Sequence, residues 1–133
     1  MLPERNNHVA ASKSPVIENE LNGQVLDRST RFFRALADTP RVRLLARLAK
    51  GPAYVSDLAR AEGATVPLIS QRLRVLKDQK LVVSKRMGKR ISYSLSDHEM
   101  LAAFEHVLHS IINFRPRGPR AKSSTRVEKG RRQ

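Results

Sequence analysis

The chain has 133 residues, 40% of them apolar, which is sufficient for one domain with a hydrophobic core. It contains no cysteine, so disulfides, thiolate metal sites and thiol redox sensing are excluded. Its 26 basic and 12 acidic residues give a net charge of +14, which favours a polyanionic partner over a merely soluble surface.

Both ends of the chain differ from its middle. Residues 1–17 are polar and interrupted by Pro3 and Pro15, and residues 115–133 carry eight basic residues and one acidic residue. Neither segment can bury enough surface to offset the entropy of ordering, so we predict a disordered arm and a disordered basic tail around a domain at 18–114. No apolar run suits a membrane span or a signal peptide, so a cytoplasmic protein is expected.

Two helices are predicted in the first part of the domain. Apolar residues recur at helical spacing from about Glu18 to Ala37, with Gly23 as a weak point. Pro40 then occupies a favoured first helical position. The second helix is predicted from Arg41 to Lys50, because Gly51 and a proline stop it.

A short helix, a tight turn and a longer helix follow. Ser56 is predicted to cap the short helix, which Gly63 ends. Thr65 is predicted to cap the longer helix, which has Pro67 in its first turn, where a missing N–H costs nothing. This fourth helix is expected to run to about Lys80.

The apolar period then changes from helical to alternating. Residues 81–86 and 91–95 are typical of strands, and the turn between them contains a glycine. Ser96 or Asp97 is predicted to cap a last helix, which carries an apolar stripe and ends near Phe114. The order α-α-α-α-β-β-α predicts a mainly α fold with a β-hairpin wing, the winged helix-turn-helix.

The fourth helix has two chemically different faces. At 100° per residue, Ile69, Leu73 and Leu76 fall together on the core side. The other side carries groups suited to base edges and phosphates. A solvated face without a ligand would also carry such residues, but a position second in a helix-turn-helix favours DNA. The candidate DNA-binding residues here are Thr65, Pro67, Ser70, Gln71, Arg72 and Arg74.

The tip of the hairpin has four cations within six residues. Lys85, Arg86, Lys89 and Arg90 would repel one another unless an anion lay beside them. We interpret them as a wing that follows phosphates or enters the minor groove. The alternative is an edge strand that lysines protect from aggregation.

Three segments carry a family likeness. ALADTPRVRLL (35–45), SQRLRVLKDQKLV (70–82) and RMGKRISYSLSD (86–97) together resemble the ArsR/SmtB family of dimeric bacterial metal-sensing repressors. The resemblance, which covers roughly 32–112, implies a winged-helix homodimer joined through the first and last helices. It also implies a near-palindromic double-stranded DNA operator, from which an inducer releases the repressor.

The family's inducer sites match this chain poorly. Its cysteine motif would fall near residues 53–57, where no thiolate is present. Its last-helix site implies Asp97 as a first ligand and places Glu99 at the second position. The later pair of ligands falls on Ser110 and Asn113, and neither is a good ligand.

Two histidines stand one turn before that later pair. We therefore hypothesise a shifted site between subunits, with Asp97 and Glu99, or His98, from one helix and His106 and His109 from its partner. These oxygen and imidazole donors suit Zn²⁺, Ni²⁺ or Co²⁺. The alternative is that they are ordinary polar residues of a dimer helix, in a repressor that senses no metal.

Other classes of function fit less well. An enzyme is not expected, because the chain has no cysteine nucleophile, no Gly-rich phosphate loop and no recognisable Ser-His-Asp arrangement. A non-specific nucleoid protein or an RNA-binding protein would share the charge. Neither would need a face suited to base edges beside a wing.

Overall fold

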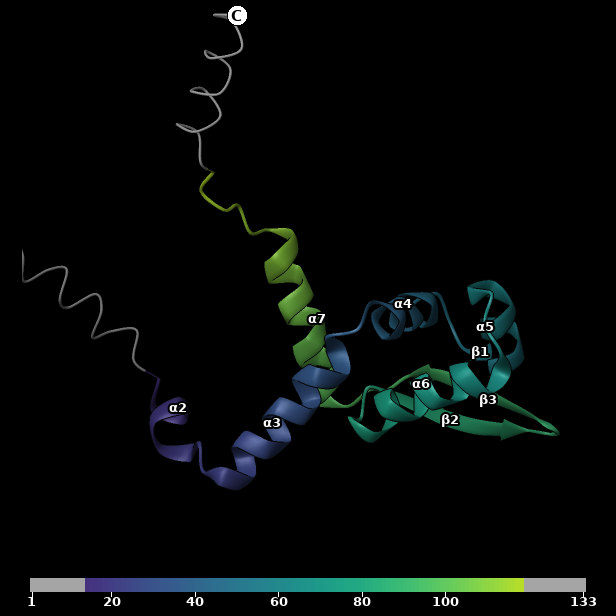
Figure 1. The fold of residues 1–133 in the computed structure, drawn as a ribbon, viewed down its shortest axis with the longest axis horizontal. Helices are drawn as coiled ribbons and strands as arrows, with labels where there is room; N and C mark the ends of the chain where they lie inside the picture. The colour runs from purple at the N-terminus through teal and green to yellow at the C-terminus, as the bar shows by residue number, and fades with distance from the viewer. Residues whose placement is uncertain (1–13, 119–133) are drawn as a thin grey trace, which may run out of the picture. The chain divides into compact units, whose positions relative to one another are not determined.

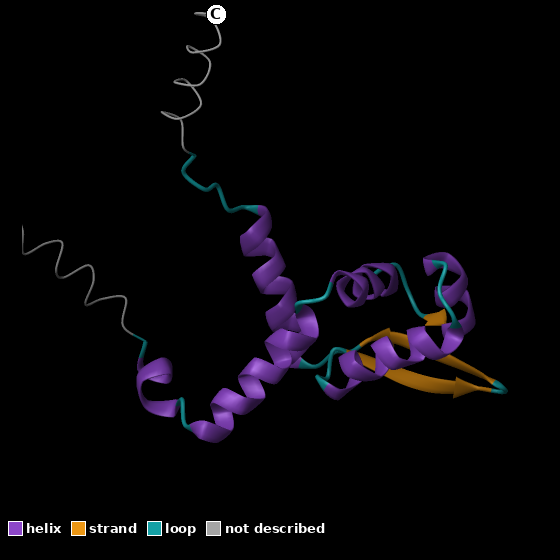
Figure 2. Cartoon of the chain, in the orientation of Figure 1, coloured by secondary structure: helices purple, strands orange, loops and turns teal. Residues whose placement is uncertain are grey.

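The computed structural model describes residues 14–118, and their elements follow the predicted order with two additions (Figures 1 and 2). The chain divides after Leu101 into two compact units, and α7 continues across that division. The elements are α2 (Pro15–Glu20), α3 (Gly23–Leu36), α4 (Thr39–Leu48), β1 (Ala53–Tyr54), α5 (Val55–Glu62), α6 (Val66–Asp78), β2 (Val82–Met87), β3 (Arg90–Leu95) and α7 (Glu99–Ile112).

The predicted first helix is two helices. The side-chain oxygen of Asn22 accepts a hydrogen bond from the Val25 N–H at 3.0 Å, which starts α3 anew. At the start of α2, the Ser14 hydroxyl accepts from the Ile17 N–H at 3.5 Å, with proline in the first turn. Residues 15–17 are therefore helical, contrary to the predicted arm. Most of the predicted arm (1–13) and tail (119–133) lies outside the described residues.

The corner between α3 and α4 is built by one arginine. Asp38 caps α4, and its carboxylate lies 3.0 Å from Arg41 Nη1. Arg41 also donates from Nε to the Ala35 carbonyl at 2.6 Å and from Nη2 to the Arg34 carbonyl at 3.1 Å. It therefore supplies partners to two carbonyls at the end of α3, where intrahelical N–H donors run out, and the Arg34 carbonyl also accepts from the Ala37 N–H at 3.2 Å.

The helix-turn-helix consists of α5 and α6. Gly63 ends α5 at φ 62°, a left-handed conformation that glycine adopts without steric cost, as predicted. The Thr65 hydroxyl accepts from the Leu68 N–H at 3.3 Å, which confirms Thr65 as the cap of α6. The prediction that Ser56 caps α5 is wrong, because α5 already begins at Val55. Tyr54 occupies the cap position and makes no side-chain capping bond.

The wing is a three-stranded antiparallel sheet in the order β1-β3-β2. Strand β1, which is absent from the predicted elements, pairs Ala53 with Tyr93 and Tyr54 with Ser92. The hairpin turn is shorter than predicted, because Met87 and Arg90 are already paired. Its first central residue is a glycine at φ 65°, as tight hairpin turns favour. The hairpin tip extends beyond α5 and α6 in Figure 1.

The core of the first unit lies beneath the helix-turn-helix. Its completely buried side chains come from α4, α6 and the entry to β2, and no buried side-chain polar atom in the described part of the chain lacks a partner. The hydrophobic burial of these residues is what holds the helices in place. They are Leu44, Ile69, Leu73, Leu76, Leu81 and Val82.

The last helix begins later than predicted. His98 precedes α7 and accepts a hydrogen bond at Nδ1 from the Met100 N–H at 3.0 Å. The predicted cap Ser96 instead accepts from the His98 N–H at 3.2 Å, one step upstream, and Asp97 makes no such contact in the described residues. Within 14–118, no helix is long and apolar enough to cross a membrane.

Candidate nucleic-acid interface

The two faces of α6 are separated as the sequence predicts. Ile69, Leu73 and Leu76 are each 0% exposed and fix the helix on the core. Four of the six candidate DNA-binding residues here, Thr65, Pro67, Gln71 and Arg74, are exposed, whereas Ser70 and Arg72 are half-buried. A helix fixed on one side, with Gln71 and Arg74 exposed on the other, can present directional groups to base edges.

Three of the four wing cations are available to a ligand. Lys85, Arg86 and Lys89 are exposed, and none has an ion pair within the described residues. Lys85 lies opposite Ser92 and Arg86 opposite Ile91, so consecutive cations project from opposite faces of the hairpin. The hairpin therefore presents positive charge on both faces.

Arg90, the fourth wing cation, is already engaged within the protein. Its guanidinium carbon lies 3.6 Å from the centre of the Tyr54 ring. Its Nη2 donates to the Ser56 hydroxyl at 3.3 Å and to the Asp57 carboxylate at 3.4 Å. The sequence pattern groups Arg90 with the free cations, because these partners lie more than thirty residues away and carry no local signal.

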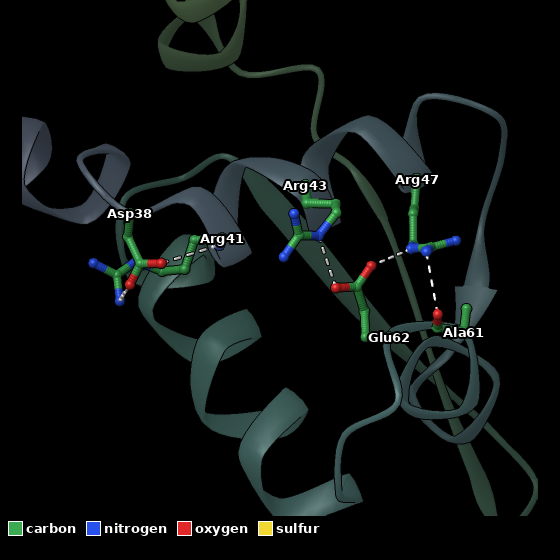
Figure 3. A network of polar contacts seen from close by, with 6 residues as sticks. All are labelled: Asp38, Arg41, Arg43, Arg47, Ala61 and Glu62. Carbon is green, nitrogen blue, oxygen red and sulfur yellow. Dashed lines mark hydrogen bonds and ion pairs between the residues drawn. The ribbon is translucent and has the colours of Figure 1, made fainter.

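Helix α5 is braced against α4 by one carboxylate (Figure 3). Glu62 accepts hydrogen bonds from Arg43 Nε, at 2.9 Å, and from Arg47 Nε, and its side chain is 5% exposed. Arg47 also donates to the Ala61 carbonyl at 3.2 Å. The hydrogen bond from Arg47 lowers the pKa of Glu62 most, opposed by burial and aided by Arg43. Glu62 is therefore held as an anion at the turn of the helix-turn-helix.

One hydrogen bond joins α6 to the wing, and a second joins the segment after α6 to the residue after β3. Lys77 Nζ donates to the Ser84 hydroxyl at 2.8 Å. The Ser96 hydroxyl donates to the Lys80 carbonyl at 2.7 Å. Lys80 itself has φ 64°, so the chain reverses sharply between α6 and β2. Strand β2 is thereby set beside the helix that carries the polar face.

The candidate metal ligands are all exposed but form no site within one chain. Across residues 14–118, no three His, Asp or Glu side chains are grouped closely enough to hold a metal ion. His98 uses Nδ1 at the start of α7, and His109 Nδ1 lies 3.2 Å from the Asn113 amide nitrogen. The remaining exposed candidates are Asp97, Glu99 and His106.

A helix-turn-helix followed by a basic antiparallel wing defines the winged helix-turn-helix class of proteins. Solved structures agree with this class. A homodimeric winged helix-turn-helix DNA-binding domain from Mycobacterium bovis has a TM-score of 0.58 and 28% identity, over 71% of this chain and 91% of that one. NolR from Sinorhizobium fredii has a TM-score of 0.57 and 28% identity, over 76% and 94%.

The chain belongs to the ArsR family. Residues 38–84 match the family model of bacterial regulatory proteins of the arsR family. The regulator NmtR of Mycobacterium tuberculosis is 38% identical over 91 residues, 68% of this chain and 76% of that protein. A transcriptional repressor SmtB homologue from Synechocystis is 40% identical over 76 residues, 57% of this chain. The match spans 58% of that repressor's length. The family predicted from the three sequence segments is confirmed.

Proposed function

We propose that this protein is a homodimeric, sequence-specific repressor that binds a double-stranded DNA operator and is released by an inducer. The observation that carries this proposal is the exposed polar face of α6 beside three wing cations without ion-pair partners in the described residues. The relatives are regulators and repressors by name, which supports a regulatory rather than a catalytic role.

In this proposal, α6 and the wing have separate tasks. The exposed face of α6 enters the major groove, where Gln71 and Arg74 pair with base edges, and Thr65 and Ser70 approach phosphates. Pro67 contacts the groove wall, and the half-buried Arg72 lies at its margin. The wing cations Lys85, Arg86 and Lys89 bind phosphates or enter the minor groove.

Apolar side chains that one chain leaves exposed support the homodimer. On α3, Leu26 is 48% and Phe33 62% exposed, and on α7 Val107 is 49% and Ile111 62% exposed. Exposed apolar faces of this kind are typical of protein interfaces. A dimer would also place two copies of α6 on one operator, which a near-palindromic sequence requires.

For the inducer, we propose Zn²⁺, Ni²⁺ or Co²⁺ at a site shared between two α7 helices. Asp97 and Glu99, or His98, of one protomer and His106 and His109 of the other would supply oxygen and imidazole donors. This set fits such a metal chemically, because His106 and His109 lie one turn apart on α7 and both are exposed. Bound metal would supply a cross-link between protomers that changes their relative orientation.

One observation favours a second candidate, a repressor of the same fold that senses no metal. His98 and His109 each already have a ring nitrogen near a hydrogen-bond partner within the chain. His98, whose ring nitrogen accepts from a backbone N–H at the start of α7, has a structural role without any ligand.

In either case we propose a cytoplasmic, nucleoid-associated protein with the DNA-binding and dimerisation domain near residues 18–114. The basic segment 115–133 would add phosphate contacts that salt weakens.

The test begins with a duplex that the wild-type chain selects from a random pool. Fluorescence anisotropy at fixed salt then measures its binding with chelator and with each metal. We expect metal to weaken binding at least tenfold, which is about 1.4 kcal/mol of coupling. We expect no response in His106→Ala/His109→Ala, and a normal response in Ser110→Ala, the matched control on α7.

Specific binding that no metal changes would support the metal-independent repressor. If random DNA or RNA competes as well as the selected duplex, the proposal of a specific repressor is wrong.

A further inference from the structure

We propose that Arg90 is a positioning residue that fastens the wing to the first turn of α5, and that it does not bind DNA phosphates itself. This inference rests on the proposed DNA binding and concerns how the two parts of that interface are held together. It separates Arg90 from Lys85, Arg86 and Lys89, with which the sequence pattern had grouped it.

The pairing of β1 with β3 places Arg90 against α5. Tyr54 lies opposite Ser92, and Arg90 precedes Ser92 by two residues on the same strand. Side chains two residues apart share a face of a strand, so Arg90 and Tyr54 emerge on the same face. The guanidinium consequently lies over the ring, 3.6 Å from its centre, well within the range of a cation–π contact.

The same guanidinium reaches past Tyr54 into the first turn of α5. Its Nη2 lies 3.3 Å from Ser56 Oγ and 3.4 Å from Asp57 Oδ2. Asp57 is held in turn by Arg60, whose Nη1 lies 2.9 Å from the other carboxylate oxygen. Arg90 therefore binds one ring, one hydroxyl and one carboxylate, all on the segment that opens the helix-turn-helix.

Because of the position of Arg90 in the hairpin, these contacts restrain the wing near its turn. It is the first residue of β3 and lies directly opposite Met87, at the last pair before the turn. A contact there restrains the far end of the hairpin, whereas Lys77 with Ser84 restrains it nearer its base. Together they hold the wing tip at a fixed position relative to α6.

The neighbouring residue Lys89 provides a matched control. It carries the same charge, is exposed, and has no hydrogen bond or ion pair in the described part of the chain. Each phosphate that a protein neutralises adds about 0.9 to the steepness of log affinity against log salt. Lys89→Gln should therefore make that slope shallower by about 0.9. Arg90→Gln should weaken binding and leave the slope unchanged.

Tyr54→Leu tests the fastening without altering any charge. The Tyr54 side chain makes no capping bond to α5, so leucine removes the ring and leaves the helix start as it is. We expect Tyr54→Leu and Arg90→Gln each to weaken binding to the selected duplex about three- to tenfold. The double variant should be little weaker than either single one, because both remove the same contact.

The experiment measures anisotropy at four salt concentrations, with amide hydrogen exchange of 87–91 in the DNA-free protein. Faster exchange in Tyr54→Leu and Arg90→Gln, but not in Lys89→Gln, is the expected result. If Arg90→Gln lowers the salt slope as Lys89→Gln does, and Tyr54→Leu binds and exchanges as wild type, Arg90 is a phosphate ligand and the inference is overturned. If wild type selects no duplex but the exchange pattern is as expected, only the proposed function fails.

Discussion

Two clusters of charged residues hold the two ends of α5, and they differ in burial. At its C-terminal end, the Glu62 side chain is 5% exposed and is shared by two arginines of α4. Near its N-terminal end, Arg90 and Asp57 are 50% and 48% exposed. A buried carboxylate depends strongly on its partners, whereas an exposed pair is screened by salt. The charged contacts therefore hold α5 to α4 more firmly than they hold the wing to α5.

The largest effect on the free energy of unfolding is expected from a substitution in the hydrophobic core. Leu73→Ala removes a completely buried side chain of α6, and we expect it to lower the free energy of unfolding by about 3 kcal/mol. Val83→Ala, at a position 47% exposed on β2, should change it by less than about 0.5 kcal/mol. Urea denaturation of both variants measures the difference, and equal losses would contradict the placing of Leu73 inside the core and of Val83 outside it.

The comparison between the clusters is tested by neutralising one carboxylate in each. Glu62→Gln should cost about 1.5 kcal/mol, a value reduced because Arg43 and Arg47 remain partly exposed. Asp57→Asn should cost about 0.5 kcal/mol or less. Denaturation at low and at high salt checks both values. A larger loss for Asp57→Asn would reverse the comparison.

Acidification should remove the contribution of the Glu62 carboxylate to the free energy of unfolding. The pKa of Glu62 is lowered in the folded protein, so its anionic form is favoured by folding. Its contribution is complete above the pKa of an unfolded glutamate and is lost as the pH falls through the lowered folded value. The stability difference between wild type and Glu62→Gln should therefore be constant near neutral pH and shrink in acid. A difference that grows on acidification would contradict the assigned sign.

A smaller loss of unfolding free energy is expected from a substitution at the start of α6. Thr65→Ala removes the hydroxyl that accepts from the Leu68 N–H, and should cost about 1 kcal/mol of unfolding free energy. Thr65→Ser keeps the cap and serves as the control in thermal unfolding. Equal destabilisation by both substitutions would show that the methyl group, not the cap, matters.

The smallest effect on stability is expected at the wing tip. Lys85→Gln/Lys89→Gln should change the unfolding free energy by less than about 0.5 kcal/mol, because both side chains are exposed. The same variant should make the salt dependence of DNA binding shallower by about 1.8. Unaltered salt dependence, measured by anisotropy, would remove the wing from the proposed interface.

Local signals made much of the fold predictable. Gly63 ends α5 and Thr65 starts α6, and each of these signals can be recognised from a few neighbouring residues. The buried face of α6 follows from the spacing of three apolar residues. The break before α3 has a local signal too, because Asn22 is a strong capping residue, but the apolar period continues across it and hides the break.

The contacts that position the candidate site were not predictable, because they join distant residues. Arg43 and Glu62 are 19 positions apart, and Arg90 and Asp57 are 33 apart. Strand β1 has two residues, too few to show alternation. Without β1, nothing in the sequence brings Arg90 to Tyr54. The sequence therefore indicated which residues carry charge, but not which of those charges are already bound.

The two-residue strand β1 also has a mechanical consequence. Its pairing with β3 joins the chain just before α5 to the chain just after the wing turn, which encloses the helix-turn-helix in a closed loop. Tension applied along the backbone from Ala53 to Tyr93 is borne by this short pair before it reaches α5 or α6. The enclosed helices can therefore keep their geometry when the neighbouring segments are pulled, until that pair parts.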